Sequence, residues 1–142
     1  MIVVDSSAVI AIMFGEPSSE ALLARLVADP DRVISAASYL ESGTVLAGRR
    51  RTDRVLAIDD LDEFLSSAGI ELAALDAQQA HIALRARILH GRGMGHGGTL
   101  NFGDAFSYAL AKTLDAPLLF VGDDFATTDV KVALAPAAQR RR

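Results

Sequence analysis

The stretch that decides the fold is Met1-Ile2-Val3-Val4-Asp5-Ser6-Ser7-Ala8. It predicts a short buried strand over residues 2–5, because an apolar run stops abruptly at a carboxylate. A helical pattern follows from Ser7 to Phe14, where Gly15 can end the helix. In open α/β sheets, ligands bind in the crevice beyond the carboxyl ends of the strands. A strand that ends in Asp5 therefore puts a negative charge where a ligand would sit.

The rest of the chain alternates short apolar segments with helical ones. We expect further strands over residues 32–35, 70–72 and 117–121, and helices over residues 18–28, 37–51, 54–67, 76–90 and 101–114. Such alternation is typical of a parallel sheet that is covered by helices on both faces. The predicted fold class is therefore α/β with three layers, in which a mostly parallel central sheet is flanked by helices.

The length of 142 residues suits one domain with a substantial core. Apolar residues make up 51% of the chain, which excludes a disordered protein. We expect a folded domain over residues 1–135 and a disordered basic tail over residues 136–142, which ends in three arginines. The glycine-rich segment Gly91–Gly98 is either a mobile connector or a loop that closes over a substrate.

Composition excludes several classes of protein. The chain has no cysteine, which rules out a disulfide framework and a thiolate zinc site and fits a cytoplasmic protein. We expect no signal peptide before the first strand and no membrane span, because no apolar run approaches about 20 residues. The net charge of −4 does not favour nucleic-acid binding unless a bound cation reverses the local field.

Acidic residues stand where the predicted fold would bring them to one edge of the sheet. Asp5 and the pair Asp123-Asp124 follow strands, while Glu41 and Asp104 are expected in the first turns of helices. Carboxylates that converge repel one another, and a divalent cation removes that cost. Mg²⁺ and Mn²⁺ prefer hard oxygen ligands. A site of this kind suits the hydrolysis of a phosphodiester.

Each acidic residue also has a purely structural interpretation. Asp5 can cap the helix that starts at Ser7. The segment Ser38-Tyr39-Leu40-Glu41 has the form of a capping box, and Asn101 with Asp104 forms a similar pair. Asp123 and Asp124 are ordinary turn formers. None of these interpretations, however, predicts all the acids together.

Four segments follow one another along the chain: Val3-Val4-Asp5-Ser6-Ser7-Ala8, Ser38-Tyr39-Leu40-Glu41, Asn101-Phe102-Gly103-Asp104-Ala105-Phe106-Ser107-Tyr108-Ala109-Leu110-Ala111 and Leu118-Leu119-Phe120-Val121-Gly122-Asp123-Asp124-Phe125. In this order they resemble the PIN domain family, and within it the VapC toxins of bacterial toxin–antitoxin pairs. Each segment alone is a weak signal, but the set spans nearly the whole chain, from Ile2 to about Asp129.

The resemblance implies an endoribonuclease that depends on Mg²⁺, which Mn²⁺ can replace. It implies three partners: an RNA substrate, a cognate antitoxin that neutralises the enzyme, and a second copy in a homodimer. It assigns Asp5, Glu41 and Asp104 to a metal site, with Asp5 and Asp104 as direct ligands and Ser7 and Asn101 as polar supports. The fourth acid is Asp124 or Asp123, and the similar G-x-D-F form favours Asp124. Val121 departs from the pattern, because relatives often carry lysine or a hydroxyl residue there.

Two other functions stay open on the sequence. One is a non-catalytic PIN-fold module that binds RNA or an antitoxin without metal-dependent cleavage. The other is an aspartyl phosphatase, although that chemistry usually wants a second acid where Ser7 stands.

Three further groups have two interpretations each. The arginines at positions 49, 50, 51 and 54 either contact RNA or solvate a helix end. The aromatic residues at positions 102, 106 and 108 either stack on bases or pack in the core, and we favour the core. Exposed apolar side chains among Val55, Leu61 and Leu65 would permit a dimer.

Overall fold

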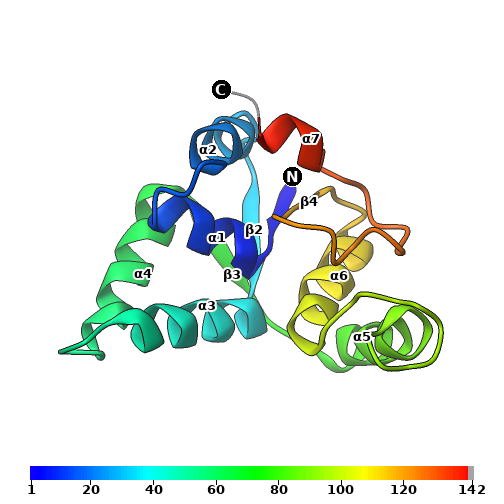
Figure 1. Cartoon of the computed structure of the whole chain (residues 1–142). Coiled ribbons are helices and arrows are strands. Elements are labelled where there is room, and N and C mark those ends of the chain that lie inside the picture. Colours follow the sequence, from blue (N-terminus) through cyan, green and yellow to red (C-terminus); the bar gives the residue numbers. More distant parts are fainter. Residues whose placement is uncertain (141–142) are drawn as a thin grey trace.

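The computed structural model describes residues 1–140 and has the α/β architecture that the sequence predicts (Figure 1). Four strands and seven helices are formed in this part of the chain. In chain order they are β1 Ile2–Val4, α1 Ser6–Met13, α2 Ser19–Val27, β2 Arg32–Ser35, α3 Ala36–Arg49, α4 Leu56–Ser67, β3 Ile70–Ala73, α5 Ala77–His90, α6 Phe102–Leu114, β4 Leu118–Leu119 and α7 Pro136–Gln139.

The sheet has the order β3-β2-β1-β4, and all three strand pairs are parallel. β1 is an inner strand, with Val3 beside Val33 of β2 on one side and beside Leu118 of β4 on the other. Parallel strands put their carboxyl ends at one edge, so Asp5 lies at the edge to which β2 and β4 also lead. The prediction of a mostly parallel sheet is confirmed.

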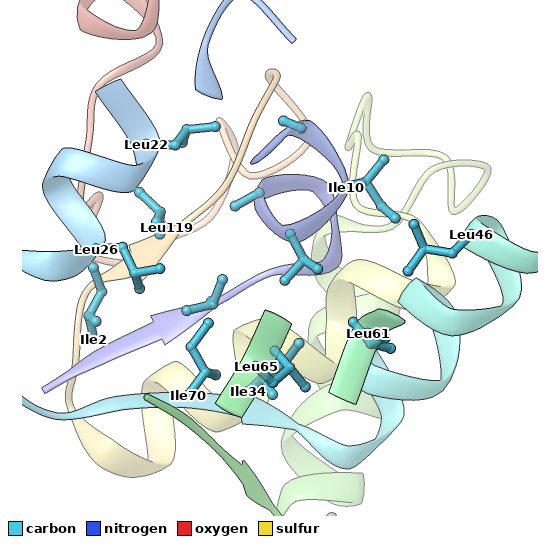
Figure 2. Close-up of a cluster of buried hydrophobic side chains, with 14 of the residues drawn as sticks. Ile2, Ile10, Leu22, Leu26, Ile34, Leu46, Leu61, Leu65, Ile70 and Leu119 are labelled. Atoms are coloured by element: carbon cyan, nitrogen blue, oxygen red, sulfur yellow. The ribbon is translucent and has the colours of Figure 1, made fainter. Parts of the chain in front are cut away.

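Two hydrophobic clusters cover the faces of the sheet. Ile2 and Val4 belong to a cluster with residues of α1, α2 and α4 on one face, and Figure 2 shows Leu22, Leu26 and Leu61 of this cluster. Val3 points the other way and packs with residues of α5 and α6. Because successive side chains of a strand alternate between faces, the apolar run at the start of the chain serves both clusters.

The helix that carries Glu41 begins at Ala36, one residue before its expected start, but its N-cap is not the one that the sequence pattern suggests. Ser35 is the N-cap of α3, and its Oγ accepts a hydrogen bond from the backbone nitrogen of Ala37 at 3.2 Å. The expected capping box from Ser38 to Glu41 is therefore wrong, and Glu41 lies in the second turn instead of the first. By contrast, Asn101 and Asp104 do form a capping box at the start of α6.

Three other expectations differ from the structure. The tail is not disordered over residues 136–139, which form α7; the buried side chain of Gln139 donates a hydrogen bond to the carbonyl of Phe120 at 2.7 Å. Arg141 and Arg142 lie outside the described residues. Leu61 and Leu65 belong to the core, so only Val55 of the proposed dimer contacts is exposed. Phe102, expected in the core, is 71% exposed.

Candidate active site

Asp5 belongs to the acidic edge, which is the carboxyl edge of the sheet with Asp5, Glu41, Asp104 and Asp124, and its carboxylate is held by two hydroxyl groups and one backbone N–H group. Its Oδ2 accepts hydrogen bonds from the Oγ and the backbone nitrogen of Ser7, at 2.6 and 3.0 Å. Its Oδ1 accepts one from the Oγ of Ser107 at 2.5 Å. Asp5 is thus both the N-cap of α1 and a candidate site acid, so the two interpretations of the sequence are compatible.

The hydroxyl groups around Asp5 extend into two neighbouring segments. The Oγ of Ser7 accepts a hydrogen bond from the backbone nitrogen of Val121 at 3.0 Å, which joins β1 to the segment after β4. The Oγ atoms of Ser38 and Ser107 lie 3.0 Å apart and are buried. Because Ser107 uses its proton on the Asp5 carboxylate, Ser38 must be the donor in that pair. α1, α3 and α6 therefore all contribute to the orientation of one carboxylate.

Glu41 reaches the same edge from α3. Its Oε1 accepts a hydrogen bond from the Oγ of Ser6 at 2.6 Å. Its carboxylate lies against the backbone of Gly103 in the first turn of α6, where an added Cβ would come within 2.0 Å of Oε2. Glycine is therefore required at position 103 for Glu41 to occupy this place.

Asp104 lies at the acidic edge in the first turn of α6. Its Oδ2 accepts a hydrogen bond from the backbone nitrogen of Asn101 at 2.9 Å, and the side chain of Asn101 accepts one from the nitrogen of Asp104 at 2.8 Å. The predicted supporting role of Asn101 thus takes the form of a helix cap that fixes the Asp104 side chain.

The structure distinguishes the two candidates for the fourth acid. The side chain of Asp124 lies 3.5 Å from the Nδ2 of Asn101 and 3.5 Å from a guanidinium nitrogen of Arg92. The side chain of Asp123 is exposed, and within residues 1–140 it makes no hydrogen bond or ion pair. Asp124, the preferred candidate, therefore lies beside the other acids.

The carboxyl groups perturb one another. Burial, together with the charges of Asp5 and Asp124, raises the pKa of Asp104 to about 8, against the hydrogen bond from the backbone of Asn101. Burial also raises the pKa of Asp5, although hydrogen bonds from Ser107 and Ser7 oppose the shift. The pKa of Glu41 is raised by burial and by the charge of Asp5, against the hydrogen bond from Ser6. Ionisation of all these carboxyl groups at once is therefore costly, and a bound cation would remove part of that cost.

The donor set fits a hard divalent cation. All candidate donor atoms are carboxylate oxygens, and Asp5 uses three of its roughly four lone-pair sites on serine donors, which leaves one available. Within residues 1–140, no three acidic or histidine side chains are spaced so that they could hold a metal ion together. One or two direct carboxylates with waters would match the usual coordination of Mg²⁺.

Sequence reasoning missed four residues of this edge, namely Ser6, Ser38, Gly103 and Ser107. Ser107 gave one usable signal, because it stands one helical turn after Asp104 on a face that is otherwise apolar. The role of Gly103 had no local signal, since it depends on a glutamate far away in the sequence.

Comparison with known proteins identifies the family. The family model for the PIN domain matches residues 2–131. The ribonuclease VapC42 of Mycobacterium tuberculosis is 41% identical to this chain over 131 residues, which are 92% of this chain and 98% of the relative. The ribonuclease VapC of Mycolicibacterium smegmatis is 44% identical over 128 residues, with coverage of 90% and 96%.

Solved structures share the fold. Mycobacterium tuberculosis VapC20, described as a toxin that cleaves the sarcin–ricin loop, superposes with a TM-score of 0.72 at 21% identity and covers 96% of this chain and 100% of its own. A chain of a toxin–antitoxin complex from Klebsiella pneumoniae superposes with a TM-score of 0.67 at 17% identity, with coverage of 96% and 98%.

Proposed function

We propose that this chain, which belongs to the PIN domain family and is a relative of the VapC ribonucleases, is the Mg²⁺-dependent endoribonuclease toxin of a toxin–antitoxin pair. The observation that carries the proposal is that Asp5, Glu41 and Asp104 reach the same carboxyl edge of a parallel sheet, where the charge of Asp5 acts on both of the others. Burial raises the pKa values of all three carboxyl groups, and a bound cation would offset the cost of ionising them.

Asp5 and Asp104 would hold Mg²⁺ directly, with Mn²⁺ as a substitute, and Glu41 and Asp124 would act through water. When bound there, Mg²⁺ would supply neutralisation of the phosphate, a lower pKa for a bound water and stabilisation of the leaving oxygen. Ser7 and Ser107 keep the Asp5 carboxylate in one orientation. Glu41 orients the attacking water and takes its proton at Oε2, which a raised pKa favours.

The substrate is RNA with an exposed backbone, such as a single strand or a loop. An antitoxin neutralises the enzyme, and two copies form a homodimer. Within the described part of the chain, no helix is long and apolar enough to cross a membrane. The antitoxin proposal is tested by co-expression with the product of the adjacent reading frame, which should copurify with the chain and relieve the growth arrest that the chain causes alone.

Cleavage of RNA by purified variants tests the catalytic proposal. Asp5→Asn and Asp104→Asn should each lower kcat by at least about a hundredfold, and chelation by EDTA should abolish wild-type cleavage until Mg²⁺ is restored. Asp59→Asn on the exposed surface of α4 is the matched control and should cleave normally. Asp124→Asn should lower activity where Asp123→Asn does not. Equal cleavage by the wild type, Asp5→Asn and Asp104→Asn would refute the mechanism and favour a module that only binds.

A further inference from the structure

The loop after α5 is closed at its base and is not a free connector. The backbone nitrogen of Arg92 donates to the carbonyl of Leu100 at 2.9 Å, and the nitrogen of Leu100 donates to the carbonyl of His90 at 3.0 Å. Gly98 allows this approach, because a Cβ there would lie 2.2 Å from the carbonyl oxygen of His90, and Gly91 lets the chain leave α5 where a Cβ would lie 2.0 Å from the carbonyl oxygen of Arg87. The loop therefore turns back at a fixed point between α5 and α6 (Figure 1).

A half-buried arginine fastens this base from within α5. The Nη1 of Arg87 donates a hydrogen bond to the carbonyl of Leu100 at 2.7 Å and approaches the carbonyl of Arg92 at 3.4 Å. The two sides of the loop base, at Arg92 and at Leu100, are thus bonded to the same side chain. The backbone of Arg92 is therefore held in place, and its side chain extends from this fixed point.

The same loop is attached to the acidic edge. The Oγ1 of Thr99 donates a hydrogen bond to the carbonyl of Asp124 at 2.8 Å, and the guanidinium of Arg92 lies 3.5 Å from the Asp124 carboxylate. Among the ion pairs within residues 1–140, this pair alone joins a cation to a candidate site acid.

The basic run at the end of α3 does not serve this position. Arg49 lies over the ring of Phe14, and Arg50 pairs with Asp60. Both arginines lie at the C-terminal end of α3, two turns beyond Glu41. Their contacts are with Phe14 and Asp60, and not with the acids of the acidic edge.

We propose that Arg92 binds a phosphate of the RNA substrate at the acidic edge, and that the clamped loop is the scaffold that presents it there. A polyanion that approaches four carboxylates needs a cation beside the one at the metal site. The Arg92–Asp124 pair is long, and its side chains are 67% and 39% exposed, so the guanidinium can exchange Asp124 for a phosphate at little cost. The planar fork of a guanidinium suits a phosphate. This inference rests on the proposed function of the same site.

The test measures binding separately from cleavage. The full chain with Asp5→Asn, which slows cleavage, is titrated into a fluorescein-labelled single-stranded RNA in Mg²⁺, and anisotropy gives Kd at several salt concentrations. Adding Arg92→Gln should raise Kd about tenfold and lower the slope of log Kd against log salt by about 0.7. Arg92→Lys should keep the slope and recover part of the affinity. Arg85→Gln, on the exposed surface of α5, is the matched control and should change neither quantity.

In the background with Asp5 intact, Arg92→Gln should raise KM for RNA and leave kcat nearly unchanged. Its thermal midpoint should equal that of the wild type, because the side chain is exposed. An unchanged Kd and salt slope in Arg92→Gln would overturn the inference, even while the wild type cleaves RNA. Failure of the wild type to cleave RNA would instead overturn the proposed function, and the salt slope would still decide whether Arg92 contacts the phosphate.

Discussion

At the scale of single residues, the positions of the carboxylates at the acidic edge depend on small neighbouring residues. Gly103 shows this most directly, because its missing side chain is the space that the Glu41 carboxylate occupies. Ser107 shows it in a second way, since a hydroxyl at that buried point of α6 reaches Asp5 without displacing it. The acids attract attention in the sequence, but their positions depend on these neighbours.

Replacement of Gly103 by alanine should lower activity without lowering the stability of the fold. The added Cβ would force the carboxylate of Glu41 to move, so we expect kcat for RNA cleavage to fall by at least about tenfold. The free energy of unfolding should hold or rise by up to about 1 kcal/mol, because alanine is the better helix former and a carboxylate can swing away. Gly48→Ala, where an added Cβ meets nothing within 4 Å, should gain similar stability at full activity. Full activity of Gly103→Ala would show that Glu41 is not needed where the structure has it.

Removal of the Ser107 hydroxyl should weaken the site through Asp5. The Ser107 hydrogen bond lowers the pKa of Asp5, so Ser107→Ala should raise that pKa further and make the carboxylate a poorer ligand. We expect the Mg²⁺ concentration for half-maximal cleavage to rise about 10- to 100-fold. Ser42→Ala removes an equally buried hydroxyl that bonds only to the carbonyl of Ser38, and should lose about 1 kcal/mol of stability with normal Mg²⁺ dependence. The same Mg²⁺ dependence in both variants would contradict an orienting role for Ser107.

At the scale of elements, the site is made by the N-terminal parts of three helices. α1 begins one residue after β1, α3 begins directly after β2, and α6 begins at a capping box. Asp5 is the N-cap of α1, Glu41 lies in the second turn of α3, and Asp104 lies in the first turn of α6. Except for α7, the elements were predictable from hydrophobic periodicity. The N-cap of α3 was not, because Ser35 and Ser38 are equally good caps locally, and the four-residue pairing of β2 with β3 holds Ser35 at the end of its strand.

Loosening the loop after α5 should act on substrate binding through Arg92. Arg87→Gln removes the guanidinium that joins the carbonyls of Leu100 and Arg92, so the loop base loses its internal anchor. We expect KM for RNA to rise severalfold with kcat nearly unchanged. Combined with Arg92→Gln, the second substitution should add little, since both act through one contact. Strictly additive effects on KM would show that Arg87 acts elsewhere, and Arg85→Gln again serves as the control on the same helix.

At the scale of the whole molecule, the fold class and the set of acids were predictable from the sequence, while the contacts between distant segments were not. The run Ile2 to Val4 predicts a strand that is buried on both faces, and the structure confirms it. The end of the chain shows the limit of such reasoning. The tail after Pro136 ends in three arginines, which suggests disorder, yet the buried amide of Gln139 donates hydrogen bonds to the carbonyls of Phe120 and Leu134. Arg92 shows the same limit at the site, because only the closed loop puts its charge beside Asp124.

The free energy of unfolding of the metal-free molecule should depend on pH through the carboxyl groups of the acidic edge. The pKa of Asp104 is about 8 in the folded chain, against 3.8 as its ordinary value. Between these values the unfolded chain has released the proton that the folded chain still holds, so folding binds a proton and the free energy of unfolding falls as pH rises. Asp5 and Glu41, whose pKa values are also raised, contribute with the same sign. The lowered pKa values of Asp29, Asp115 and Asp129 act below this range.

Asp104→Asn should therefore stabilise the metal-free chain, and more so at high pH. In EDTA, urea denaturation at pH 8 should give the variant an unfolding free energy higher than the wild type by about 2 kcal/mol, while the two should nearly agree at pH 4. Asparagine can still accept the hydrogen bond from the backbone of Asn101, so the cap of α6 is kept. The exposed Asp59→Asn variant should follow the wild type at every pH. With Mg²⁺ present, the wild type should regain stability at pH 8 and Asp104→Asn should gain less, because a cation that compensates the carboxylates stabilises only the chain that carries them. A wild-type stability that rises from pH 5 to 8 in EDTA would refute the view that the edge holds uncompensated charge.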